Sequence, residues 1–329
     1  MAYSLRSQLH MLNDQMDEAV RWGDRALAVE AQFPNPDVRA HALNNIGTAM
    51  VFRGRTEGEP LLEESLRISL ANGLHEHAAR AYTNTSEYAV EFRRFELAER
   101  MLMQGIAFDV EHDLDAWSFY LYGRLALLRL EQGRIKDAET ITNGVMERSG
   151  LTLVVRLPAR LVQARARMLQ GLPDAASLLE QAFTDAMATD ELQHVVPARF
   201  SLIEQAWLAG TPAAAEEHLD ALMALSTDDR HAWNMGERAV WAKRFGRSTD
   251  GLRRNDLPEP YLRELDGDLA GAAEAWEALG MPYAAALVRL QTEDAETLGA
   301  AVSELEAMGA AAAGAAGRRR AEAVGLRAL

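Results

Sequence analysis

The sequence predicts an all-α fold in which antiparallel helix pairs stack into a right-handed superhelix, an α-solenoid. Three observations lead to this prediction. Amphipathic segments of helical period alternate with short breaks, the breaks recur at nearly constant spacing, and no stretch alternates apolar and polar residues as a strand would. A repeat array also explains how 329 residues can form one elongated domain, because each unit packs only on its neighbours.

The breaks set the register of the repeat. They fall at Asp14, Gly54, Arg93, Gly133, Gly171 and Gly210, with spacings of 40, 39, 40, 38 and 39 residues. Gly210 suits the left-handed residue that ends a helix, Thr211 can cap the next helix, and Pro212 fits its first turn. Asn35-Pro36 gives the same start signal for the second pair. The period is therefore about 39 residues.

A small residue follows the breaks at a fixed distance. Alanine stands five positions later at Ala19, Ala98, Ala138, Ala176 and Ala215, and the same offset joins Gly267 to Ala272. Gly54 is the exception, because Glu59-Pro60 stands there. Large residues follow four positions later at Leu102, Leu179, Leu219 and Trp276, which is the spacing of a buried helical stripe. This order of small and large residues is the tetratricopeptide pattern, so the pairs are tetratricopeptide-like.

The helices follow from this register. We expect them at 2–13, 16–31, 36–53, 57–72, 75–92, 95–111, 114–132, 134–149, 154–170, 173–189, 191–209 and 212–225. The period breaks after about residue 228, where a polar loop, FGRSTDGLRRNDLPEP, begins at Phe245. Helix pairs resume at 260–279 and 281–308, before an Ala/Gly-rich end with Arg318-Arg319-Arg320. We therefore predict helical repeats over 1–246 and a C-terminal helical extension over 247–329 that continues or caps the array.

Composition excludes several functions. The net charge of −15 opposes binding to a phosphate backbone, so we expect no direct contact of this segment with nucleic acid. The absence of cysteine excludes disulfides, thiolate nucleophiles and cysteine-based metal sites. No signal peptide precedes the first helix and no apolar run is long enough to span a bilayer, which predicts a cytoplasmic protein without membrane contact.

Three stretches resemble the C-terminal helical-repeat region of the large ATP-binding LuxR-type transcriptional regulators, a signal-transduction ATPase family. They are LTLVVRLPARLVQARARMLQGLPDAASLLEQA, LQHVVPARFSLIEQAWLAGTPAAAEE and, most specifically, DLPEPYLRELDGDLAGAAEAWEALGMPYAAALVRLQTEDAETLGAAVSELEAMGAAAAGAAGRRRAE. The first 150 residues fit that region through the repeat alone. In such regulators the repeat region receives an inducer or a partner, between an N-terminal nucleotide-binding domain and a C-terminal helix-turn-helix.

The resemblance implies a non-catalytic sensor or protein-interaction module that binds an effector or partner protein in its concave groove. A stand-alone tetratricopeptide adaptor or scaffold is the alternative. ATP binding is not implied, because Gly309 and Gly314 have the glycine spacing of a phosphate loop but Ala315 and Ala316 replace its Lys and Ser/Thr. DNA binding is not implied either, since the sequence stops at Leu329 without the DNA-reading domain, and we interpret the chain as an excised or truncated repeat module.

The first helices of such pairs line the concave surface, which is where we expect a protein partner or a small-molecule effector to bind. Counting back from each break predicts an inward-facing set: His41, Asn44, Thr48, Arg80, Thr83, Glu87, Tyr120, Arg165, Phe200, Glu204 and Trp207. Arginine, carboxylate and aromatic side chains on one surface suit a peptide or a polar ligand. Packing between successive pairs explains Tyr120, Phe200 and Trp207 equally well, and we assign Trp117, Trp233 and Trp241 to the core.

Other residue groups give weaker signals. His75 and His77 lie two apart on a helix and point to opposite sides, so we expect no metal site, and we expect no other cofactor. No carboxylate pair, triad or phosphate loop stands in a catalytic setting, so we do not expect an enzyme. The Arg318–Arg320 run could contact a phosphate backbone, although a solvated basic face explains it more simply.

Overall fold

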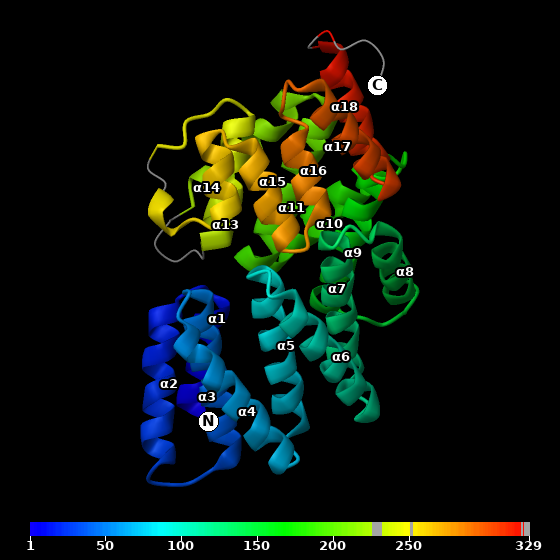
Figure 1. The fold of residues 1–329 in the computed structure, drawn as a ribbon. Helices are drawn as coiled ribbons and strands as arrows, with labels where there is room; N and C mark the ends of the chain where they lie inside the picture. The colour runs from blue at the N-terminus through cyan, green and yellow to red at the C-terminus, as the bar shows by residue number, and fades with distance from the viewer. Residues whose placement is uncertain (226–231, 251–252, 324, 326–329) are drawn as a thin grey trace. The chain divides into compact units, whose positions relative to one another are not determined.

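The computed structural model describes residues 1–225, 232–250, 253–323 and 325, and these residues form an all-α protein without strands (Figure 1). Consecutive helices pack as antiparallel-like pairs, as in a helical repeat. The described residues divide into two compact units, one over 1–124 and one from 125 onward. We call them unit 1 and unit 2.

Unit 1 contains three helix pairs and the start of a seventh helix. Its helices are α1 (Ala2–Leu12), α2 (Met16–Glu30), α3 (Pro36–Phe52), α4 (Glu59–Ala71), α5 (His75–Glu91) and α6 (Phe95–Glu111), with a short 3-10 turn at Thr56–Gly58. The helix α7 (Asp115–Glu131) crosses the division between the units. The first helices α1, α3 and α5 lie side by side, and the second helices α2 and α4 pack on α3 and α5.

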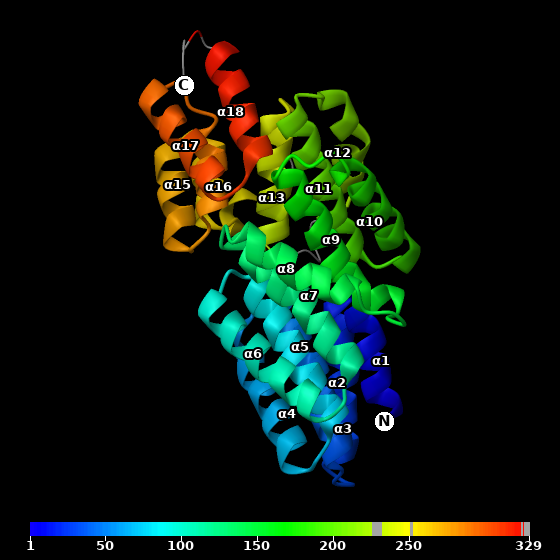
Figure 2. The ribbon, with the colours of Figure 1, turned by 90° about the vertical axis from the view of Figure 1, so that its right-hand side faces the viewer.

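Unit 2 continues the pairs and then adds a C-terminal group of helices. The helices are α8 (Ile135–Met146), α9 (Leu153–Leu169), α10 (Ala175–Thr189), α11 (Leu192–Ala209), α12 (Glu216–Met223), α13 (Ala232–Arg244), α14 (Glu259–Asp266), α15 (Leu269–Ala278), α16 (Pro282–Arg289), α17 (Ala295–Ala307) and α18 (Ala311–Ala323). Short 3-10 turns occupy Pro212–Ala215 and Arg254–Asp256. The last helix, α18, lies against both α9 and α11 (Figure 2).

The predicted breaks are confirmed by backbone geometry. All six predicted break residues have positive φ, from 57° at Arg93 to 74° at Gly54. Asp14 and Arg93 adopt this conformation without being glycine. A residue in the left-handed region cannot continue a right-handed helix, so these positions end the first helices.

The predicted small residues also lie at close contacts between helices, with two shifts of register. Five of the six predicted alanines have no exposed surface, whereas Ala176 is exposed and its neighbour Ala175 is buried. In the pair where alanine is missing, Gly58 lies at the close contact between the helices. A Cβ at this position would lie only 2.8 Å from Cβ of Met50. Ala175 and Gly58 both follow their break by four residues instead of five, so the contact falls one residue earlier in these two pairs.

The helix boundaries agree closely with the predictions up to residue 225, but α13 was not predicted. This helix follows the point where the period breaks, and it packs against α14. Gly236 permits the contact, because a Cβ there would lie 2.6 Å from Cγ of Tyr261. The predicted segments at 260–279 and 281–308 are each a pair of helices, and the Ala/Gly-rich end forms α18.

Candidate functional site

Five polar side chains lie together on the first helices of unit 1. His41, Asn44 and Thr48 share one face of α3, at spacings of three and four residues, and Arg80 and Thr83 share one face of α5. We call these five residues the α3–α5 polar row. The sequence predicted all five as inward-facing.

The row spans two helices that are joined by side-chain contacts. Asn84 donates its Nδ2 to Oδ1 of Asn44 over 2.6 Å, and the rings of His41 and His77 stack with centroids 5.1 Å apart. His77 Nε2 lies 2.7 Å from the Asp37 carboxylate. These contacts fix the side chains of α3 against those of α5.

The polar row is buried and incompletely hydrogen-bonded. His41, Asn44, Thr48 and Thr83 are between 1% and 6% exposed. Each residue of the row has an atom without a hydrogen-bond partner: His41 Nδ1, Asn44 Nδ2, Thr48 Oγ1, Arg80 Nε and Thr83 Oγ1. A buried polar atom left unpaired costs about 1–3 kcal/mol, and such atoms are rare in folded proteins. Five of them on adjacent turns mark a place where a polar ligand would gain hydrogen bonds.

Arg80 gives the row its charge. Its guanidinium lies 5.3 Å from the ring centroid of Trp117, and no hydrogen bond or ion pair joins it to another described residue. Burial lowers the pKa of Arg80, although the nearby Glu76 carboxylate acts in the opposite direction. Burial and the charge of Arg80 also lower the pKa of His41 to about 4, so this imidazole is neutral at pH 7. The row therefore presents one cation among neutral groups.

Glu87 and Tyr120, two further predicted site residues, form a hydrogen bond with each other beside the row. The Tyr120 hydroxyl donates to the Glu87 carboxylate, which lies 3.7 Å from Nε of Arg124. Arg124 also binds Glu91 over 2.9 Å. These ion pairs border the row on the α7 side.

The four remaining predicted site residues lie in unit 2 and make extensive contacts there. Arg165 binds Glu131 over 2.7 Å and Glu204 over 2.9 Å, and Tyr283 of α16 donates to Glu204 over 2.8 Å. Glu204 is 3% exposed. No local pattern indicated Tyr283 as a partner of Glu204, because the two residues are 79 positions apart in the chain.

Phe200 and Trp207 pack into the core of unit 2. Phe200 is 6% exposed, and Trp207 meets Trp241 edge to face with centroids 6.2 Å apart. Arg244 lies 4.6 Å from the Trp241 centroid and pairs with Glu264. Packing therefore accounts for both of these aromatic residues.

Of the tryptophans predicted to be core, Trp241 is buried. Trp233 packs on Tyr261 and Trp276, with ring centroids 5.9 and 6.0 Å away. Trp117 is only partly buried, and its Nε1 donates to the exposed Glu76 over 2.7 Å. Trp117 is therefore not a full core residue.

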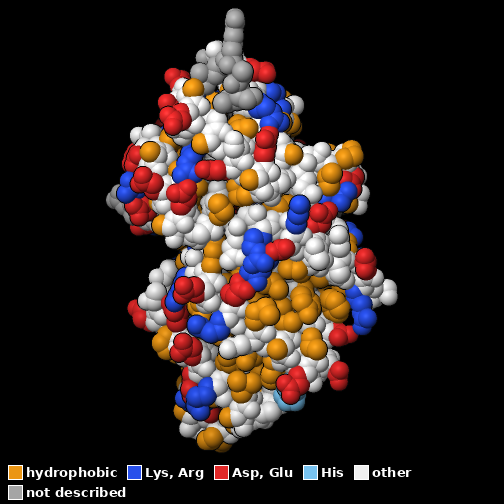
Figure 3. Space-filling view, turned by 45° about the vertical axis from the view of Figure 1, so that its right-hand side comes forward, with side chains coloured by type: hydrophobic (Ala, Val, Ile, Leu, Met, Phe, Trp, Pro, Cys, Tyr) orange, Lys and Arg blue, Asp and Glu red, His pale blue; other side chains and the backbone are white. Residues whose placement is uncertain are grey.

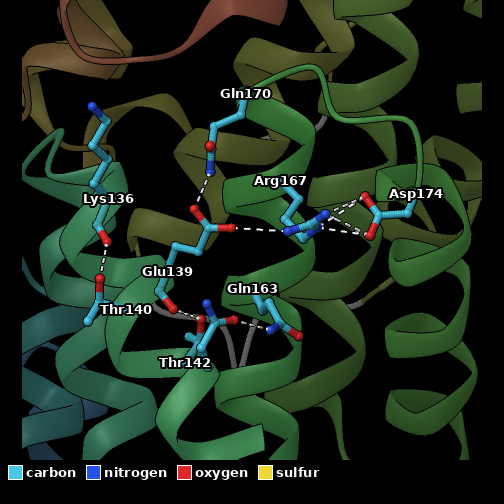
Figure 4. Close-up of polar contacts among 9 residues, drawn as sticks. Lys136, Glu139, Thr140, Thr142, Gln163, Arg167, Gln170 and Asp174 are labelled. Carbon is cyan, nitrogen blue, oxygen red and sulfur yellow. Dashed lines mark hydrogen bonds and ion pairs between the residues drawn. The ribbon is translucent and has the colours of Figure 1, made fainter.

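A second polar network lies on α8, α9 and the connection that follows α9 (Figure 4). Unlike the residues of the α3–α5 polar row, its residues form hydrogen bonds and ion pairs with one another. Arg167 binds Glu139 over 3.1 Å and Asp174 over 2.9 Å, and Gln170 donates to Glu139 over 3.0 Å. Gln163 donates to Asn143 over 2.7 Å. Such a network stabilises the packing of a helix pair without requiring a ligand.

The three arginines of the basic run near the C-terminus bind other residues of unit 2. Arg319 donates to the carbonyl of Leu208 at the end of α11, and Arg320 donates to that of Gln291 over 2.8 Å. Arg318 pairs with Glu306. Cations at the last carbonyls of a helix stabilise its C-terminus.

The described residues contain no group of three or more His, Asp or Glu that could hold a metal ion. His75, one of the two histidines considered for a metal site, packs its ring against that of His112, with centroids 4.1 Å apart. No helix in the described ranges is long and apolar enough to cross a membrane. In comparisons with known proteins, no family model matches the chain and no curated protein matches it.

Proposed function

We propose that the chain is a non-catalytic binding module that receives a small polar effector on the α3–α5 polar row. The observation that carries this proposal is the set of five buried polar atoms without partners on adjacent turns of α3 and α5. The donors of Asn44, Thr48 and Thr83 suit carbonyl or hydroxyl oxygens of a ligand, and Arg80 suits its negative charge.

We further propose that the module belongs to a LuxR-type transcriptional regulator, in which effector binding changes the packing of the helix pairs. This part rests on the resemblance of the three C-terminal stretches. The effector can act in this way only if it binds one arrangement of the pairs more tightly than another.

The test is thermal unfolding of the whole chain against a library of sugars, organic acids and phosphorylated metabolites. A ligand at a hundredfold excess over its Kd stabilises the protein by about 2.7 kcal/mol, which is readily measured. We expect a ligand whose stabilisation disappears in Arg80→Met and Thr48→Val. Arg67→Met is the matched control, because Arg67 is an exposed cation on α4 of the same unit.

Each variant is compared with its own ligand-free melting temperature, which separates binding from stability. Stabilisation that persists in both row variants would place the ligand elsewhere and contradict the proposed site. If no small molecule stabilises the chain, the adaptor with a protein partner becomes the better interpretation.

A further inference from the structure

The first helix of unit 1, α1, carries an exposed apolar stripe. Leu5, Leu9 and Leu12 are 48%, 61% and 41% exposed, and their spacing of four and three residues places them on one face of the helix. On the opposite side, Ser7 has no exposed surface and donates to the carbonyl of Ala19 in α2 over 2.6 Å. Helix α1 therefore turns a small polar residue inward and its leucines outward. We call these three leucines the α1 leucine stripe.

The face that carries the stripe is an interface in the two pairs that follow. The break residues align Leu5 with Asn45 of α3 and Asn84 of α5, because successive breaks here are 40 and 39 residues apart. Asn45 donates to the carbonyl of Ser4 in α1 over 2.9 Å. Asn84 donates to Asn44 of α3 over 2.6 Å. Each of these two asparagines thus contacts the first helix of the preceding pair.

The position of Leu9 gives the same result. Its equivalents are Ala49 of α3 and Tyr88 of α5. Ala49 has no exposed surface and clusters with Met16 of α2. The ring of Tyr88 meets that of Phe52 in α3, with centroids 6.5 Å apart. The α1 leucine stripe is therefore on the face with which α3 and α5 receive other helices, so its shape suits a helix as its partner.

The stripe is complementary to itself, which a twofold contact between two copies requires. In an antiparallel pairing centred near Ser7, Leu5 of one copy faces Leu9 of the other, and Leu12 faces Ala2. Helix α1 contains no acidic residue, although the whole chain has a net charge of −15. The pairing therefore brings no carboxylates of α1 together.

The other described helices offer no equivalent stripe. Exposed large hydrophobic side chains occur on them singly or in pairs, and α1 alone carries three on one face. Hydrophobic side chains gather in several places on the face of the molecule in Figure 3, so exposed apolar surface alone does not identify an interface. Within this chain, the surface that matches the stripe is the same stripe on a second copy.

We infer that α1 is a homodimer interface, in which the leucine stripes of two copies pack antiparallel about a twofold axis. An extended chain exposes about 1.45 Å² per dalton, so the three leucines leave roughly 250 Å² exposed on each copy. Apolar atoms make up a little over half of an interface, which gives roughly 900 Å² buried in total. Stable complexes bury about 1,200 Å² or more, so the dimer is weak and reversible. This inference does not rest on the proposed effector site.

The test is sedimentation equilibrium of the whole chain between about 2 and 200 µM. We expect the average mass to rise with concentration from that of a monomer toward twice that value. Leu5→Lys and Leu9→Glu should each remain monomeric over this range, because each places a charge against a leucine of the other copy. Phe33→Glu is the matched control, since Phe33 is 72% exposed in the same unit, and it should dimerise as the unaltered chain does.

Mixing the two stripe variants tests the antiparallel pairing. In a mixed dimer the ammonium introduced at position 5 meets the carboxylate introduced at position 9, while the remaining Leu5 and Leu9 meet each other. We expect the mixture to associate at least about tenfold more tightly than either variant alone. Melting temperatures of the variants show whether they remain folded.

A chain that remains monomeric at about 200 µM overturns the inference and leaves the stripe for a helix of a different protein. A dimer that persists in both stripe variants also overturns it, because the interface then lies elsewhere. So does a mixture that associates no better than its two components. None of these results bears on the effector site, which thermal unfolding with ligands tests separately.

Discussion

Asp109 of α6 provides the sharpest test of the electrostatics of unit 1. Its side chain has no exposed surface, and neither carboxylate oxygen has a hydrogen-bond partner. Burial, together with the negative charge of Glu76, raises the pKa of Asp109 from its ordinary value of 3.8 to about 7. We predict that Asp109→Asn stabilises the protein, and more strongly at higher pH.

The sign follows from proton binding. Between pH 3.8 and 7 the folded state binds more protons at Asp109 than the unfolded state does, so the free energy of unfolding falls as pH rises through this range. The shift corresponds to an upper limit of about 4 kcal/mol. Glu76 is exposed and His112 is only half-buried, so solvent screens part of the effect, and we expect about 2 kcal/mol.

The assay is urea denaturation of Asp109→Asn and the unaltered chain at about pH 5 and pH 8. A gain of 2 kcal/mol moves the denaturation midpoint by at most about 1 M, because the slope of about 2 kcal/mol per M that is usual for small proteins rises with chain length. Glu111→Gln, at an exposed carboxylate of the same helix, is the control and should show no gain that depends on pH. An equal midpoint for Asp109→Asn and the unaltered chain at pH 8 would refute the reasoning, and so would an equal gain at both pH values.

Three further predictions concern other buried contacts. Tyr283→Phe removes the hydroxyl that donates to Glu204, and it should lower the free energy of unfolding by about 1.5–3 kcal/mol in urea denaturation; a loss near zero would mean that the bond contributes nothing. Gly236→Ala forces a Cβ against Tyr261 and should cost about 1–3 kcal/mol, which an unchanged melting temperature would contradict. The pKa of His41 is lowered from 6.5 to about 4, so the unfolded state binds more protons between these pH values. The free energy of unfolding should therefore fall by up to about 3 kcal/mol as pH falls from 6.5 to 4. A His41→Asn variant should lose less of its melting temperature over that range.

The repeat could be predicted from the sequence because its signals are local. The residue at each break ends a helix through its own backbone conformation, and the following small residue meets a helix only one connection away. Asp14 and Arg93 show that spacing was a better guide than residue type, because neither is a glycine and both adopt positive φ. The prediction fails by one position at Ala176, because Ala175 is the buried residue at this contact and Ala176 is exposed.

The candidate site was only partly predictable, because helical spacing gives the face of a residue but not what covers that face. Counting back from the breaks placed Thr48 and Glu204 in equivalent positions on first helices. Their surroundings differ, since Thr48 Oγ1 has no partner whereas Glu204 accepts bonds from Arg165 and Tyr283. That difference depends on contacts between residues far apart in sequence, which no local pattern encodes.

The contrast between the two units argues for where an effector would act. In unit 2, Tyr283 hydrogen-bonds Glu204 on α11, and Arg319 donates to the end of the same helix. The C-terminal helices therefore already satisfy polar groups of the first helices in that unit. In unit 1, the equivalent face of α3 and α5 keeps five buried polar atoms without partners. Since an unpaired buried group gains most from a new hydrogen bond, a polar ligand would bind more favourably to the row in unit 1 than to the filled face in unit 2.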